Sequence, residues 1–213
     1  MVYIFLGVPG SGKGTIAKNL VKQKKYKHLS TGDLFRYHIK NKTDLGKEVM
    51  SVIDSGKLVN DNLTNQIAKE EILTYDNNEV LLLDGYPRTL NQAKFLNDLL
   101  INNNIDFKYS IYLNISKDEV IKRLSSRYVS KSGNTYNRDL HKIKNINEKY
   151  FVKDEEVYQR EDDKPENVKK RFEEYLNKTT PLIKYYKDMN KLLEIDANNK
   201  PKKIYKNVLK AFK

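Results

Sequence analysis

A glycine-rich loop between an apolar run and an amphipathic segment is the feature that most restricts the fold of this chain. Residues 7–15 read Gly-Val-Pro-Gly-Ser-Gly-Lys-Gly-Thr. Residues 2–6 before the loop are typical of a buried parallel strand, and residues 13–24 after it carry apolar side chains at helical spacing. A simple turn needs one or two glycines, whereas four of them before and around a lysine let main-chain N–H groups bind phosphate at a helix N-terminus. The loop therefore predicts a nucleoside triphosphate site, with Lys13 facing the terminal phosphates.

Apolar runs and amphipathic segments alternate along the rest of the chain. Further buried strands are predicted at residues 79–83, 110–115 and 191–195, and helices at residues 90–100, 117–127, 165–186 and 201–212. Such alternation is typical of an α/β fold in which helices cover both faces of a parallel sheet. We therefore predict a P-loop three-layer fold with a parallel central sheet.

Two segments interrupt this alternation. Residues 31–59 are polar and helical with no strand of their own, which indicates an inserted helical flap. Residues 128–159 contain short alternating stretches around Ser132-Gly133-Asn134, which indicates a small β-rich insertion. The chain contains no internal repeat and no low-complexity linker, and its length suits one core with small attachments.

The composition excludes some sites and favours one compartment. The chain has no cysteine and only three scattered histidines, which excludes disulfides and thiolate metal sites. Residues 1–6 lead directly into the glycine loop, and no apolar run approaches the length of a membrane span. We expect a cytoplasmic protein without membrane contact. The net charge of +12 is carried by lysines spread along the whole chain, which favours a solvated surface over a nucleic-acid site.

The arginines give an independent signal. Only seven of the 40 basic residues are arginine, at positions 36, 88, 123, 127, 138, 160 and 171. Lysine cannot replace the planar guanidinium group where two phosphate oxygens are bound at once. Arginine that persists in a lysine-rich chain therefore indicates anion sites, and all but Arg138 lie in or beside the motifs described next.

The loop and several later motifs resemble those of nucleoside monophosphate kinases. Gly14 separates Lys13 from Thr15, as in that family's Gly-x-Pro-Gly-x-Gly-Lys-Gly-Thr loop. The other matching motifs, in chain order, are Ser30-Thr-Gly-Asp33-Leu-Phe-Arg36, Gly56-Lys57-Leu-Val59, Leu83-Asp84-Gly85-Tyr86-Pro87-Arg88-Thr89 with Gln92, then Arg127, Arg160-Glu-Asp162-Asp163 and Arg171. Together they span the chain and are similar to adenylate kinases of the long-lid type.

The resemblance implies a division of the chain and of its site. The core would be residues 1–29, 60–127 and 161–213, the AMP-binding flap residues 30–59, and the lid residues 128–160. ATP would contact Gly7, Gly10, Ser11, Gly12, Lys13, Gly14, Thr15, Arg123, Arg127, Thr135, Tyr136 and Lys200. AMP would contact Thr31, Arg36, Lys57, Leu58, Val59, Gly85, Tyr86, Pro87, Arg88, Gln92, Arg160 and Arg171. The catalytic residues would be Lys13, Arg88, Arg123, Arg127, Arg160 and Arg171. Mg²⁺ would bind the ATP phosphates, with waters near Asp84 and Asp33.

The activity implied by the resemblance is reversible phosphoryl transfer from ATP to AMP, giving two ADP. Thr31 and Gln92 stand where adenylate kinases bind the adenine of AMP, while Tyr86 replaces the more common phenylalanine. Another nucleoside monophosphate kinase, with a UMP or CMP acceptor or a GTP donor, is the nearest alternative. A basic nucleic-acid-binding P-loop protein is an alternative of a different class, which steeply salt-dependent binding of nucleic acid would reveal.

The lid is expected to hold together without zinc. Relatives often place four cysteines there, whereas this chain has Ser130, Lys131 and Ser132 near the first pair. We expect packing by Tyr136, Tyr150, Phe151 and Tyr158, together with hydrogen bonds, to stabilise the lid. The absence of an exposed apolar stripe favours a monomer.

Overall fold

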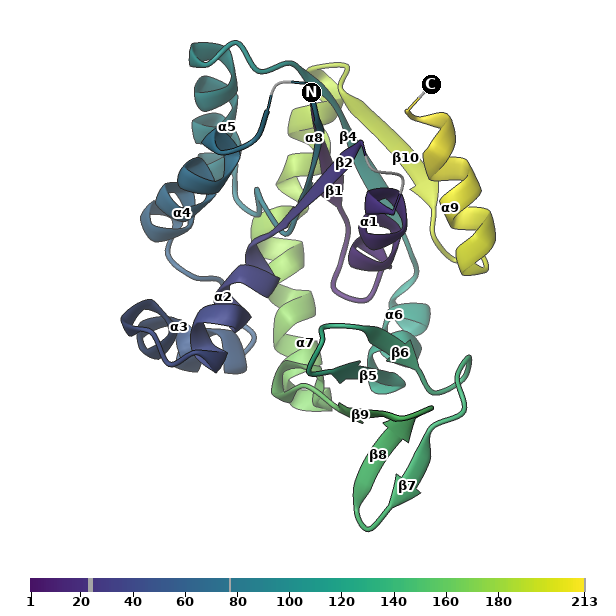
Figure 1. Ribbon diagram of the computed structural model, residues 1–213. Coiled ribbons are helices and arrows are strands. Elements are labelled where there is room, and N and C mark those ends of the chain that lie inside the picture. Colours follow the sequence, from purple (N-terminus) through teal and green to yellow (C-terminus); the bar gives the residue numbers. More distant parts are fainter. Residues whose placement is uncertain (23–24, 77, 213) are drawn as a thin grey trace.

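A five-stranded parallel sheet forms the centre of the molecule (Figure 1). The computed structural model describes residues 1–22, 25–76 and 78–212. The strands lie in the order β10-β4-β1-β3-β2 and all pair in parallel. Their bounds are β1 Val2–Leu6, β2 Tyr26–Ser30, β3 Val80–Asp84, β4 Phe107–Asn114 and β10 Leu192–Asp196. The predicted α/β fold with a parallel central sheet is confirmed.

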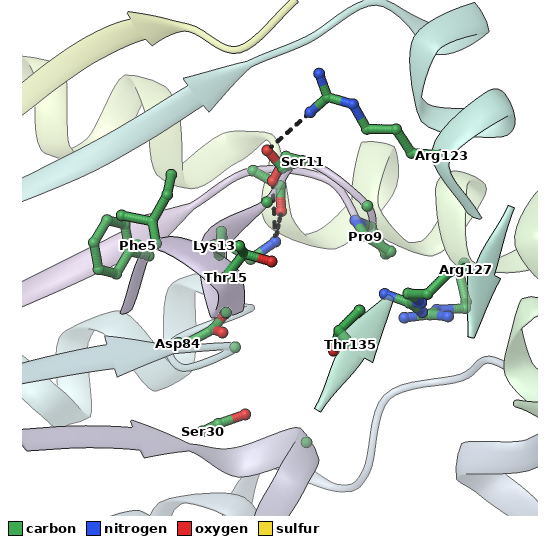
Figure 2. Close-up of a pocket in the computed structure, with 18 of the residues that line it drawn as sticks. Phe5, Pro9, Ser11, Lys13, Thr15, Ser30, Asp84, Arg123, Arg127 and Thr135 are labelled. Carbon is green, nitrogen blue, oxygen red and sulfur yellow. Dashed lines mark hydrogen bonds between the residues drawn. The ribbon is translucent and has the colours of Figure 1, made fainter. Parts of the chain in front are cut away.

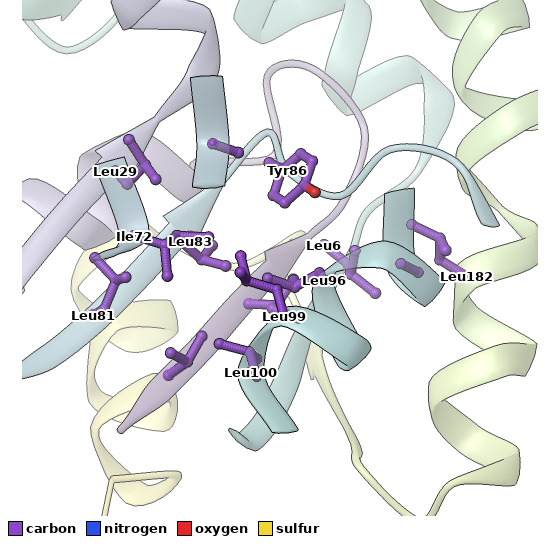
Figure 3. Close-up of a cluster of buried hydrophobic side chains, with 14 of the residues drawn as sticks. Leu6, Leu29, Ile72, Leu81, Leu83, Tyr86, Leu96, Leu99, Leu100 and Leu182 are labelled. Atoms are coloured by element: carbon purple, nitrogen blue, oxygen red, sulfur yellow. The ribbon is translucent and has the colours of Figure 1, made fainter. Parts of the chain in front are cut away.

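Helices cover both faces of this sheet because its central strands are apolar on both sides. Ile4 and Leu83 point to one face, where they pack with α4 (Asp61–Leu73), α5 (Leu90–Asn102) and α8 (Pro181–Asp188) in the cluster of Figure 3. Phe5 and Leu82 point to the other face, toward α1 (Lys13–Val21) and α9 (Pro201–Lys210). The two clusters and the sheet between them form the three predicted layers.

The carboxyl ends of three neighbouring strands meet at one edge of the sheet. Asp84 at the end of β3 is in register with Phe5 of β1 on one side and with Ser30 of β2 on the other. The glycine loop follows β1 at this edge. In open parallel sheets ligands bind at the carboxyl ends of the strands, so the topology places the candidate site here.

The flap consists of two short helices held tightly together. Helices α2 (Thr31–Lys40) and α3 (Asp44–Asp54) are N-capped by the side chains of Ser30 and Thr43. A Cβ atom on Gly46 would lie 2.2 Å from the main-chain oxygen of His38. Only glycine allows this close approach, so the flap is a compact unit.

The second insertion is a separate antiparallel sheet, as predicted. Its strand order is β6-β5-β9-β8-β7, and the hairpin β7-β8 extends farthest from the core (Figure 1). The bounds are β5 Arg127–Ser130, β6 Thr135–Asn137, β7 Lys144–Ile146, β8 Lys149–Val152 and β9 Glu155–Tyr158. Helices α6 (Lys117–Ser125) and α7 (Pro165–Glu174) connect it to the core.

Several predicted element bounds were wrong. Helix α1 ends at Val21, and the last part of its predicted range, residues 23 and 24, lies outside the described residues. The predicted helix 165–186 is two helices joined by a π-helical turn at Tyr175–Thr179, because Pro181 has no N–H to donate within a continuous helix. Strand β2 and helix α4 were not predicted. The exact limits of core, flap and lid stay a prediction.

The described helices were also compared with the length and polarity of a membrane span. Among residues 1–22, 25–76 and 78–212, no helix is long and apolar enough to cross a bilayer.

Candidate active site

A cavity of about 750 Å³ lies at the carboxyl edge of the parallel sheet and is lined by residues of the core, the flap and the lid. It brings together 23 of the 24 residues expected to bind ATP or AMP: Gly7, Gly10, Ser11, Gly12, Lys13, Gly14, Thr15, Thr31, Arg36, Lys57, Leu58, Val59, Gly85, Pro87, Arg88, Gln92, Arg123, Arg127, Thr135, Tyr136, Arg160, Arg171 and Lys200. Asp33 and Asp84 line it too. Arginines distant in the sequence therefore face the glycine loop across one space.

Tyr86 is the expected site residue that the cavity does not include. Its side chain is fully buried in the core cluster of Figure 3, where its hydroxyl donates a hydrogen bond of 2.7 Å to Oδ1 of Asn65. The structure therefore does not place the side chain of Tyr86, which was expected to bind the acceptor, in the cavity. The apolar ring packs under the strip that carries Arg88 rather than facing a ligand.

Two glycines of the loop have backbone conformations that other residues rarely adopt. Gly10 and Gly12 have φ angles of 85° and 103°, and a Cβ on Gly10 would lie 2.9 Å from Leu124. Helix α1 begins at Lys13 with no acidic residue in its first turn and no side chain capping its N-terminus. The positive end of the helix dipole thus points into the cavity.

The side chain of Lys13 lies over the glycine loop, where its contacts with main-chain oxygens can be replaced by contacts with a phosphate. Its Nζ atom donates hydrogen bonds to the main-chain oxygens of Gly7 at 2.6 Å and Val8 at 3.0 Å, and Figure 2 shows Lys13 beside Ser11 of the same loop. Burial lowers the pKa of Lys13 to about 8, and the nearby Asp84 carboxylate partly offsets this effect. An anion in the loop would restore the charge that burial disfavours.

Asp84 lies at the end of β3, beside the loop (Figure 2). Burial alone would raise its pKa, but contact with His28 and the charge of Lys13 lower it below the usual range. The Nε2 atom of His28 lies 3.4 Å from Oδ2 of Asp84. The sequence analysis missed His28, whose role depends on strand β2 lying next to β3.

Carboxylates orient the guanidinium groups of the lid and hinge. Asp163 is almost fully buried and pairs with both Arg127 and Arg171, with Arg127 Nε at 2.7 Å from Oδ2 and Arg171 Nη1 at 2.9 Å from Oδ1. Arg171 Nη1 also lies 3.0 Å from Oδ2 of Asp162. The two aspartates follow Arg160 in the chain, so one short segment carries Arg160 and orients Arg127 and Arg171.

The cavity holds an excess of positive charge in the absence of an anion. Burial, followed by the charge of Arg171, lowers the pKa of Arg88 to about 10. Burial and the neighbouring Arg36 likewise lower the pKa of Arg160 to about 10, although Asp33 lies 3.7 Å from it. Cations crowded in this way attract the phosphates of a ligand. Arg138, the one arginine outside the motifs, is not among the lining residues.

The flap and the acceptor strip meet at Gly85. Its main-chain oxygen accepts hydrogen bonds from Thr31 Oγ1 at 2.8 Å and from Arg88 Nε at 2.7 Å. Gly85 has a φ of 78°, and a Cβ there would lie 2.8 Å from Nη2 of Arg88. Only glycine at this position leaves room for the guanidinium group of Arg88 to pack this closely against the main chain.

The sequence analysis also missed part of the lining near the glycine loop. Asn137 is the last residue of β6, and Asp139, Leu140 and His141 follow it, whereas Asn198 and Asn199 come from the loop before α9. None belongs to a motif quoted above, and only their place after Tyr136 and before Lys200 could have drawn attention to them.

The lid is stabilised by a polar network as well as by packing. Glu155 accepts hydrogen bonds from the hydroxyls of Ser132 and Tyr136 and from Asn134 Nδ2, the last at 3.3 Å. The hydroxyl oxygens of Ser130 and Ser132 lie 2.9 Å apart and share a hydrogen bond. Among the described residues, no group of three or more His, Cys, Asp or Glu side chains could hold a metal ion.

The expected aromatic packing of the lid was half right. Tyr136 and Tyr150 pack around Tyr128, Val152 and Val157. Phe151 is absent from this cluster, and Tyr158 is half exposed, at 50%. Successive residues of a strand point to opposite faces, so Val152 and Val157 take the inner positions beside them.

This fold and site define a P-loop phosphoryl-transfer protein: a phosphate loop after a buried parallel strand, faced by arginines from a flap, a strip and a lid. A family model described as adenylate kinase matches residues 5–191. An adenylate kinase of Treponema denticola is 45% identical over 94% of each chain. One of Fervidobacterium nodosum is 40% identical over 100% of this chain and 99% of its own, and one of Thermosipho melanesiensis is 42% identical over 98% of each. The chain belongs to the adenylate kinase family.

Proposed function

We propose that this chain catalyses the reversible transfer of the γ-phosphoryl group of ATP to AMP, giving two ADP, and so balances the adenine nucleotides. The single observation that carries this proposal is that Lys13 of the phosphate loop and Arg88 of the acceptor strip line the same cavity. Family membership supports the same reaction.

The reaction needs positioning more than proton transfer. An oxygen of the AMP phosphate is already an anion, so it can attack the γ-phosphorus without a side-chain base. The new bond joins that oxygen to the γ-phosphorus, and the bond from the γ-phosphorus to the β,γ-bridging oxygen breaks. Lys13 and the loop N–H groups would hold the donor phosphates, and Arg88 and Arg36 the acceptor phosphate.

The remaining arginines would neutralise the charge of the transferring group. Arg123 comes from α6, Arg127 from the first lid strand, and Arg160 and Arg171 from the segment that leaves the lid. Their guanidinium groups can each bind two phosphate oxygens and are oriented before the ligand arrives. Closure of flap and lid over the cavity would exclude the water that hydrolyses ATP.

Magnesium ions fit the cavity as partners of the donor phosphates. Asp84 offers a carboxylate beside the loop, and a Cβ on Gly14 would lie 3.3 Å from its Oδ2 atom, so glycine keeps the space around that oxygen open. With Asp33 it could bind waters of a Mg²⁺ ion held mainly by phosphates. The ion would supply neutralisation of the triphosphate charge.

The test is an assay of diphosphate formation by the purified chain, with ATP or GTP as donor and AMP, GMP, UMP or CMP as acceptor. We expect rapid turnover with ATP and AMP only. Rapid turnover with a pyrimidine acceptor alone would overturn the assignment of AMP, and steeply salt-dependent binding of nucleic acid without turnover would overturn the assignment as a kinase.

Four further expectations stay predictions. They are the cytoplasmic location, the monomeric state, the absence of nucleic-acid binding, and the limits of core (1–29, 60–127, 161–213), flap (30–59) and lid (128–160). Sedimentation of the purified chain tests the monomer, and hydrogen exchange with and without nucleotides tests whether the flap and lid respond as units.

A further inference from the structure

The side-chain amide of Gln92 is held at both of its ends. Its Oε1 atom accepts a hydrogen bond of 2.7 Å from the main-chain N–H of Arg88. Its Nε2 atom donates one of 2.7 Å to Oδ1 of Asp61, the first residue of α4. Gln92 is only 2% exposed, yet it lines the cavity. The amide is therefore fixed before a ligand enters.

The partners also determine which way the amide faces. A main-chain N–H can only donate, so it must meet the amide oxygen. A carboxylate can only accept, so it must meet the amide nitrogen. Rotating the amide by half a turn would put two donors together at Arg88 and two acceptors together at Asp61. Both ends oppose that rotation.

Asp61 is itself fixed, which makes the second contact rigid. Its other oxygen, Oδ2, accepts a hydrogen bond of 2.8 Å from Thr89 Oγ1. The same hydroxyl caps helix α5 by accepting from the main-chain N–H of Gln92 at 3.2 Å. The carboxylate of Asp61 thus joins the first turn of α4 to the first turn of α5, with one oxygen on each partner.

Within residues 1–22, 25–76 and 78–212, the fixed orientation leaves Gln92 one free donor at Nε2 and one free acceptor position at Oε1. Adenine matches this pair, because its 6-amino group donates and its neighbouring ring nitrogen accepts. A purine with an oxygen at position 6 presents an acceptor where the amide oxygen already stands. It would be accommodated only by the rotated amide, which Asp61 and Arg88 oppose.

We propose that Asp61 is a positioning residue that makes the acceptor site select 6-amino over 6-oxo purines, by locking the orientation of the Gln92 amide. This inference rests on the proposed transfer to AMP. It differs from a purely structural role, in which Asp61 would join α4 to α5 and support every acceptor equally.

The experiment compares AMP with IMP, which carries an oxygen in place of the 6-amino group. The measured quantity is the ratio of kcat/KM for AMP to kcat/KM for IMP, with ATP as donor. In Asp61→Asn the side chain keeps its shape but can turn a donor toward Gln92, so rotation of the amide loses one of its two obstacles. We expect the ratio to fall at least about tenfold, the scale of a hydrogen bond to a charged group.

The matched control is Asp44→Asn. Asp44 is the first residue of α3, as Asp61 is of α4, and its side chain is fully exposed. The control removes the same charge from the same helix position without touching Gln92, and its ratio should equal that of the unmodified chain. Asp61→Ala is a second variant, expected to shift the ratio in the same direction. Misfolded protein cancels from a ratio, so partial loss of folded enzyme does not hide the result.

The outcomes separate the two proposals. If the unmodified chain does not phosphorylate AMP, the proposed function fails. If it phosphorylates AMP in preference to IMP but both Asp61 variants keep that preference, the role of Asp61 alone is overturned. Equal loss of activity with both acceptors also overturns that role, because it is the behaviour of a structural residue. An unmodified chain that uses AMP and IMP equally overturns the inference as well.

Discussion

The Nζ atom of Lys18, on the first core helix, donates a hydrogen bond to the main-chain oxygen of Gly133 in the turn of the lid, 115 residues away in the chain. A second lysine approaches the same turn from the flap, since Lys40 Nζ lies 3.5 Å from the main-chain oxygen of Lys131. Core, flap and lid are thus joined over the cavity by two flexible cations. These contacts favour the closed position of the lid.

Replacing Lys18 with methionine should weaken ATP binding more than it slows turnover. The substitution keeps the apolar stem and removes the only charged contact of this side chain with the lid turn among the described residues. A partly exposed hydrogen bond to a charged group contributes about 1 kcal/mol, so we expect the KM for ATP to rise about fivefold with a smaller change in kcat. Steady-state kinetics at saturating AMP measures both.

Lys22→Met is the control for Lys18. Lys22 is an exposed residue at the end of the same helix, and its replacement removes the same charge. The KM for ATP should stay unchanged in this variant. An equal rise in both variants would show that net charge, rather than the contact with Gly133, determines the effect.

The low pKa of Lys13 predicts a pH dependence of ATP binding. Burial brings the pKa from 10.5 to about 8. Between these values the unfolded chain holds a proton that the folded chain has lost, so this group makes the free energy of unfolding rise with pH across that window. Phosphates favour the protonated lysine, so ATP affinity should fall by up to about tenfold per pH unit above pH 8.

Calorimetric titration of ATP in buffers of different ionisation enthalpy checks this prediction. Binding above about pH 8 should take up a proton, because the bound phosphates restore the charge of Lys13. Lys13→Met should bind ATP weakly and without that proton uptake. Binding by the unmodified chain that is independent of both pH and buffer would contradict the role of Lys13.

The sequence predicted those parts of the fold whose signals are local. The glycine loop is identified by its residue types and spacing. The strands Val2–Leu6 and Val80–Asp84 are identified as central because their apolar residues point to both faces of the sheet. Strand β2, Tyr26–Ser30, was missed because it is an edge strand with one fully buried residue, Leu29. The break in the helix before Pro181 was missed because the spacing of apolar residues typical of a helix continues on both sides of it.

The same distinction holds for the candidate site. The loop and the arginines follow from residue type and spacing, so they could be named in advance. Asp61, His28 and Glu155 could not, because each acts through a partner at least 19 residues away, as in the contact between Tyr136 and Glu155. Polar residues of this kind look like surface residues until the fold brings their partners to them.

Arg88→Lys tests whether the acceptor site needs a guanidinium group. Arg88 Nε donates to Gly85 at 2.7 Å, which leaves the two terminal nitrogens for two phosphate oxygens. Lysine keeps the charge but offers only one nitrogen, so kcat/KM for AMP should fall. The expected fall corresponds to about 2 kcal/mol or more of lost transition-state stabilisation.

Arg138→Lys is the matched control for that substitution, since Arg138 lies outside the cavity lining. It should leave kcat/KM for AMP unchanged. If Arg88→Lys retains full turnover and full affinity for AMP, Arg88 does not bind the acceptor phosphate.

Glu155→Gln should loosen the lid while leaving the core intact. Hydrogen bonds from Ser132 and Tyr136 lower the pKa of Glu155 from 4.5 to about 2. A carboxyl group with a lowered pKa stabilises the fold fully above its ordinary value, and this contribution is lost as the pH falls from about 4.5 toward 2. Glutamine accepts fewer hydrogen bonds and carries no charge, so the variant should behave at neutral pH as the unmodified lid does in acid.

Hydrogen exchange of residues 130–136 measures this effect directly. Exchange in this segment should be faster in Glu155→Gln than in the unmodified chain at neutral pH. Acidification should not accelerate it further, once the intrinsic pH dependence of exchange is subtracted. Exchange in the central sheet should be the same in both proteins. Glu156→Gln is the control, because the Glu156 carboxylate faces Lys131 at 3.6 Å and Lys149 at 3.9 Å outside the network. If the two variants loosen the lid equally, the loss of a negative charge explains the change and the Glu155 network does not. The lid would then be stabilised by the packing of Tyr128, Val152 and Val157.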